Sequence, residues 1–100
     1  MLHTVNKSPY EKNTLETCID LAADGSAILL IEDGVYGAIK GGAISVKLEQ
    51  AMQSCTVHAL DADLKARGIE PEKLIDGVNI VDYSGFVELA ANSDRVQSWL

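Results

Sequence analysis

The sequence predicts a small α/β domain with a mainly parallel sheet of four to five strands and helices on both faces. Residues Ala27 to Ile31 form an apolar run that ends at the turn Glu32-Asp33-Gly34, as expected for a strand buried on both faces. Strand-like and helix-like segments alternate along the whole chain, which favours right-handed β-α-β units. With 100 residues, we expect one domain spanning residues 1–100.

The first strand and the first helix are predicted from local patterns. Residues Leu2 to Asn6 alternate apolar and polar side chains, which indicates a strand. Two capping boxes compete for the start of the helix, Ser8 with Glu11 and Asn13 with Glu16, and we favour the second. The helix should end at Asp24-Gly25, because glycine is favoured just after a helix. Its apolar face would consist of Leu15, Cys18, Ile19 and Ala22.

The second half of the chain continues the alternation of helices and strands. Its expected elements are a helix over Ser45–Gln53, a strand over Cys55–Leu60, a short helix from Asp61 to Gly68, a turn or short helix over Glu70–Ile75, a strand over Val78–Asp82 and a helix over Phe86–Ala91. The tail Arg95–Leu100 contains the only tryptophan, which we expect to dock on the core or on a partner.

A glycine-rich segment follows the central strand. Gly34 and the segment Val35–Gly42 together hold four of the eight glycines, so we expect a flexible interface loop. The segment contains neither G-x-G-x-x-G nor G-K-[ST], and Lys40 is its one positive charge, so a phosphate site is not supported. Because ligands gather beyond the carboxyl ends of parallel strands, this edge is where function is expected.

Composition excludes several classes of partner. The net charge of −7 and the pI of about 4.6 disfavour direct binding of nucleic acid or of an anionic membrane. The hydrophobic fraction of 47% is high for so small a domain and points to a buried interface. Neither a signal peptide nor a membrane helix is apparent, so we expect a cytoplasmic protein with reduced cysteines and no Cys18–Cys55 disulfide.

Two cysteines and two histidines are the side chains to test for chemistry. Cys18 is a candidate nucleophile near a helix amino terminus, yet it also lies on the apolar stripe, where a cysteine usually packs. Cys55 opens an interior strand and is expected to be structural. The two cysteines form no C-x-x-C and have no adjacent histidine, so no zinc site is expected. His3 and His58 are expected to be hydrogen-bonded histidines of the core or sheet edge.

Four segments of the chain resemble the TusB/DsrH family. They are L-H-T-V-N-K-S-P at Leu2 to Pro9, L-L-I-E-D-G-V-Y at Leu29 to Tyr36, A-L-D-A-D-L-K-A-R-G at Ala59 to Gly68 and V-D-Y-S-G-F-V at Val81 to Val87, followed by the V-Q-S-W-L tail. The resemblance implies a DsrE-like fold and a cytoplasmic sulfur-relay complex. In such a complex, this chain would join DsrE/TusD-like and DsrF/TusC-like subunits in a heterohexamer.

The same resemblance implies how sulfur would move. The complex would pass persulfide sulfur to a DsrC/TusE-like carrier, with the main active cysteine on the DsrE/TusD-like partner and with no metal or organic cofactor. The segment L-E-T-C at Leu15 to Cys18 resembles DsrH-type members, which makes Cys18 a candidate persulfide carrier and favours dissimilatory sulfur oxidation. The alternatives are a TusB-type subunit in tRNA 2-thiouridine synthesis and a purely structural subunit with no sulfur-carrying cysteine.

Overall fold

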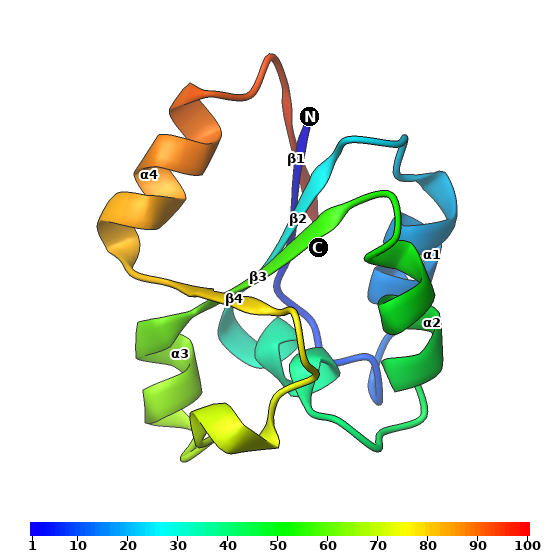
Figure 1. The fold of residues 1–100 in the computed structure, drawn as a ribbon, viewed down its shortest axis with the longest axis vertical. Helices are drawn as coiled ribbons and strands as arrows, with labels where there is room; N and C mark the ends of the chain where they lie inside the picture. Colours follow the sequence, from blue (N-terminus) through cyan, green and yellow to red (C-terminus); the bar gives the residue numbers. More distant parts are fainter.

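A computed structural model describes all residues from 1 to 100 and shows a sheet of five parallel strands (Figure 1). Their order across the sheet is β4-β3-β2-β1-β5, and every neighbouring pair is parallel. The strands are β1 (Leu2–Val5), β2 (Ala27–Leu30), β3 (Thr56–Leu60), β4 (Asn79–Val81) and β5 (Val96–Trp99). The predicted α/β fold class is confirmed.

Helices cover both faces of this sheet. Helices α1 (Thr14–Leu21) and α2 (Ser45–Ala51) lie on one face, and α4 (Tyr83–Ala91) lies on the other (Figure 1). Three further helices occupy the connections: η1 (Glu32–Ala38) follows β2, α3 (Asp61–Ala66) follows β3, and η2 (Pro71–Lys73) precedes β4. No helix of the chain is long and apolar enough to cross a lipid bilayer.

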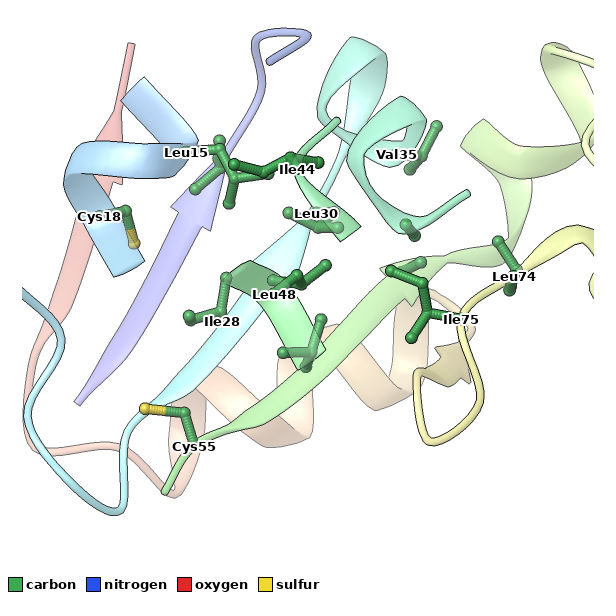
Figure 2. Packing of buried hydrophobic residues seen from close by; sticks show 14 of the residues in the cluster. Leu15, Cys18, Ile28, Leu30, Val35, Ile44, Leu48, Cys55, Leu74 and Ile75 are labelled. Atoms are coloured by element: carbon green, nitrogen blue, oxygen red, sulfur yellow. The ribbon is translucent and has the colours of Figure 1, made fainter. Parts of the chain in front are cut away.

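The main core lies between the sheet and helices α1 and α2 (Figure 2). Alternate strand residues point to opposite faces, so one set meets these helices and the other set faces α4. Both sets are buried, which explains why β2 is an apolar run and not an alternating one. The fully buried side chains on the α1–α2 side include Val5, Leu15, Cys18, Ile28, Leu30 and Leu48, and those on the other side include Leu2 and Leu29.

Two helix starts depart from the predicted capping. Helix α1 begins after Asn13 as expected, but the Asn13 side chain makes no capping hydrogen bond. Helix α4 begins at Tyr83, three residues before the predicted Phe86. The reason is Asp82, whose carboxylate accepts a hydrogen bond of 2.7 Å from the Gly85 N–H and so satisfies a free amide of the first turn.

The prediction of a flexible loop over Val35–Gly42 was wrong for its first half. Helix η1 occupies residues 32–38, and both of its glycines are buried. A Cβ added to Gly34 would overlap the Val5 carbonyl oxygen, and one added to Gly37 would lie 2.6 Å from the Leu15 side chain. These glycines therefore serve close packing of η1 against β1 and α1, not flexibility.

The carboxyl-terminal segment docks on the core, as expected, but it does so as a strand that the sequence did not reveal. Strand β5 pairs with β1, and the Leu2 N–H donates to the Arg95 carbonyl oxygen over 2.9 Å. The Trp99 indole Nε1–H donates to His3 Nδ1 over 3.1 Å. Strands β4 and β5 are thus the two edges of the sheet.

Candidate functional site

The edge beyond the carboxyl ends of β2 and β3 contains a network of three charged side chains. Arg67 donates from Nε to Asp33 Oδ1 over 2.9 Å, and its second terminal nitrogen lies 2.9 Å from the same oxygen. The remaining terminal nitrogen lies 3.6 Å from an Asp63 carboxylate oxygen. Arg67 therefore pairs with both Asp33 and Asp63 and links α3 to η1.

Asp63 also supports the one unusual backbone conformation in this network. Glu32 has a φ of 50°, a left-handed value that costs a residue with a side chain about 1–2 kcal/mol. Its N–H donates to Asp63 Oδ2 over 2.8 Å, which holds the chain in that conformation as it leaves β2. The acidic turn Glu32-Asp33-Gly34, which was predicted to mark the functional edge, therefore connects β2 and η1 to α3 through its contacts with Asp63 and Arg67.

The acids at this edge do not assemble into a metal site. Asp61 pairs with Lys65 over 2.9 Å, four residues along α3. Asp63 contacts Arg67 and the Glu32 amide, as described above. Nowhere in the chain do three or more His, Cys, Asp or Glu side chains gather in an arrangement that could hold a metal ion.

Cys18 lies in the middle of α1 with its side chain turned into the core (Figure 2). Its exposed fraction is 0%, and both it and Cys55 are free thiols. Burial, helped by the nearby Cys55, raises the pKa of the Cys18 thiol to about 12. At neutral pH the side chain is therefore a thiol, whereas sulfur transfer needs an accessible thiolate.

The outer face of α1 is held against α2 by an ion pair cluster. Lys47 of α2 lies 2.8 Å from Asp20 and 3.3 Å from Glu16, the acids placed two residues after and two residues before Cys18. These hydrogen bonds and charges raise the pKa of Lys47, which keeps it cationic. Movement of α1 that exposed Cys18 would have to break this cluster as well as the core packing.

Cys55 and the two histidines have structural surroundings. Cys55 is buried at the start of β3, where its thiol lies 3.6 Å from the Ala23 carbonyl oxygen. His58 Nε2 lies 3.0 Å from Thr56 Oγ1, and His3 accepts from Trp99, so both are hydrogen-bonded core histidines as predicted. Neither imidazole is hydrogen-bonded to Cys18, so no cysteine–histidine pair is assembled.

Both histidines make the folded state sensitive to acid. Burial lowers the pKa of His3 and of His58 below the ordinary 6.5, and each ring keeps one buried nitrogen without a partner. The unfolded chain therefore binds protons first as the pH falls. We expect stability that is constant between about pH 6.5 and pH 8 and decreases as the pH falls below about 6.5.

Urea unfolding followed by circular dichroism between pH 8 and pH 5 checks this dependence. His58→Gln should remove part of the slope across this range, because it deletes one of the two titrating groups. A slope between pH 6.5 and pH 5 that is unchanged in His58→Gln would contradict the assignment to this residue.

Sequence reasoning missed the partners of Arg67. Asp33 lies 34 residues before it, so no local pattern could pair them, although the i, i+4 spacing of Asp63 and Arg67 on α3 was a detectable signal. The structure keeps apart the side chains that were candidates for chemistry. Cys18 and His58 face opposite sides of the sheet, and at the carboxyl edge Asp33 and Asp63 are paired with Arg67.

The fold defines a small α/β domain with an all-parallel five-stranded sheet. Comparison with known proteins gives the family: residues 7–96 match the family described as DsrH like protein. Protein TusB of Pectobacterium parmentieri is 33% identical over 99% of this chain and 100% of its own length, and Protein TusB of Enterobacter sp. (strain 638) is 36% identical with the same coverage. The chain belongs to this TusB/DsrH family.

The same fold occurs in more distant proteins. The crystal structure of the ychN protein from E. coli superposes with a TM-score of 0.82 over 97% of both chains, at 23% sequence identity. At that identity the likeness concerns the fold alone.

Proposed function

We propose that this chain is a subunit of a sulfur-relay complex of the TusBCD type that serves tRNA thiolation in the cytoplasm. The observation that supports this function is identity of 31–36% to proteins named TusB along the whole chain. Within the complex, the chain would join the DsrE/TusD-like and DsrF/TusC-like subunits in a heterohexamer, from which sulfur passes to a DsrC/TusE-like carrier.

The geometry of Cys18 favours a structural role for this chain in that complex. To accept sulfur, a thiolate must attack the outer sulfur of a persulfide. The donor's S–S bond then breaks, the donor leaves as a thiolate, and a new persulfide forms on the attacking cysteine. Cys18 offers a fully buried thiol with a raised pKa instead. We therefore assign the sulfur-carrying cysteine to a partner subunit.

The competing role for Cys18, a persulfide carrier in sulfur oxidation, makes the opposite prediction in the same experiment. The chain would be co-expressed with its two partner subunits, exposed to a persulfide donor and analysed by peptide mass spectrometry. We expect added sulfur on a partner cysteine, none on Cys18, and unchanged sulfur transfer in Cys18→Ala. Added sulfur on Cys18, together with loss of transfer in Cys18→Ala, would establish Cys18 as a carrier.

Cys55→Ala is the matched control, because it removes the second buried thiol of the same core. Thermal melting of both variants shows whether any loss of transfer reflects unfolding. The pathway is tested separately by deleting the gene and measuring 2-thiouridine in tRNA. We expect 2-thiouridine to fall and the intact gene to restore it; an unchanged level would contradict a role in tRNA thiolation.

A further inference from the structure

Helix α4 is almost entirely apolar and yet contains no buried residue. Glu88 is its one charged residue. Tyr83 and Val87, four residues apart on one side of the helix, are 73% and 51% exposed. A helix that is apolar nearly all round normally lies inside a structure, so this one lacks a covering layer. Figure 1 shows α4 as the outermost layer on its side of the sheet.

The neighbouring edge of the sheet is uncovered as well. Strand β4 is an edge strand with the uncharged sequence Asn79-Ile80-Val81, and Ile80 is 41% exposed. Natural proteins usually protect such edges with charges or proline. A shallow depression with a volume of about 430 Å³ lies here, lined by Asp61, Ile80, Val81, Asp82 and Gly85. Ile80 is paired with Ala59, so its side chain points to the α1–α2 face of the sheet. The depression is also lined by Gly85 in the first turn of α4 and by its N-cap Asp82, so it wraps around the β4 edge and joins Ile80 to the exposed helix.

The charges around this surface restrict what can cover it. Asp82 and Glu88 are exposed and take part in no ion pair, while Asp61 is paired with Lys65 over 2.9 Å. A second copy of this chain would place the same acids opposite these, in a protein that already carries a net charge of −7. Like charges facing each other across an interface oppose binding, so a homodimer through this surface is disfavoured.

We propose that the β4–α4 surface, formed by Ile80, Tyr83 and Val87 and edged by Asp61, Asp82 and Glu88, binds a partner subunit that presents apolar side chains rimmed by lysine or arginine. This inference rests on the proposed function, which supplies the partner chains. The apolar character of α4 fits a permanently associated subunit better than a transient carrier, because permanent interfaces are the more hydrophobic class.

The test compares two valine substitutions in the co-expressed complex. Val87 and Val46 are both exposed valines on helices, at 51% and 64%, but Val46 belongs to α2 on the other face of the sheet. We expect Val87→Glu to weaken assembly with the partner subunits on the order of tenfold or more, as for a central interface residue, and Val46→Glu to leave it unchanged. Sedimentation measures the affinity, and melting of the isolated variants controls for folding.

The outcomes separate this inference from the function it rests on. Equal assembly of the wild type and Val87→Glu would overturn the β4–α4 surface and leave the proposed function standing. If Val87→Glu lost only binding of the carrier and still assembled with the partner subunits, the surface would bind the carrier and not a subunit. If the wild type formed a homodimer that Val87→Glu abolished, the surface would bind a second copy of this chain. Either result would overturn the assignment to a partner subunit. If the wild type bound neither subunit, the proposed function itself would fail, and this inference with it.

Discussion

Replacing Gly34 with alanine is expected to destabilise the protein by about 3 kcal/mol, a large loss for a domain of this size. The added Cβ would overlap the Val5 carbonyl oxygen, which belongs to the backbone of β1 and is fixed by the sheet. For a domain of about 100 residues, such a loss lowers the melting temperature by roughly 12–24 °C, which calorimetry measures.

Gly25→Ala provides the comparison that isolates this steric effect. Gly25 has a φ of +87°, but nothing lies within 4 Å of an added Cβ. The expected cost is the backbone strain of about 1–2 kcal/mol alone. Equal destabilisation by the two substitutions would show that the contact of η1 with β1 yields easily, and that the packing role assigned to Gly34 is wrong.

Replacing Trp99 with alanine has the second large expected effect. Trp99 packs on the core as a partly buried side chain and donates to His3, so its removal deletes apolar contacts and leaves a second nitrogen of His3 unpartnered. We expect a loss of about 2–3 kcal/mol, which is less than the roughly 3–5 kcal/mol typical of fully buried large aromatic side chains, because Trp99 is only partly buried. Urea unfolding monitored by circular dichroism gives the free energy of unfolding.

Trp99→Phe separates the contribution of the apolar contacts from that of the hydrogen bond to His3. Phenylalanine keeps most of the apolar contact but cannot donate a hydrogen bond, so about 1–2 kcal/mol should be lost. If Trp99→Phe were as destabilising as Trp99→Ala, the hydrogen bond to His3 would be the dominant contribution. If neither substitution changed stability, the docking of β5 would not depend on this side chain.

Local patterns predicted the elements whose own residues specify them. The apolar run Ala27–Ile31 gave β2 because both faces of that strand are covered, and the stripe containing Leu15 and Cys18 gave the buried side of α1. The packing alternative for Cys18 could also be inferred, since a cysteine on an apolar stripe usually faces the core. The TusB/DsrH family could be assigned because four segments match in order.

The remaining features depend on residues far apart in the chain. Glycines in η1 indicated flexibility, but their lack of a Cβ is what allows β1 and α1 to approach. Strand β5 is four residues long with three of them exposed, so it has no apolar pattern and exists through its pairing with β1. The sequence predicts that α4 is an apolar helix, but it does not show that the rest of the chain leaves this helix exposed.

The place of β5 beside β1 has a consequence for folding during synthesis. The ribosome makes strands β1 to β4 first, and these four can already pair in the order found in the finished sheet. The outer edge of β1 stays open until residues 96–99 have been made, and the hydroxyl groups of Thr4 and Ser98, 3.3 Å apart when folded, are 94 residues apart in the chain. Closing so long a loop is slow, which prolongs the lifetime of a nascent chain with an open strand edge. Aggregation of the newly made chain is therefore expected to begin at β1.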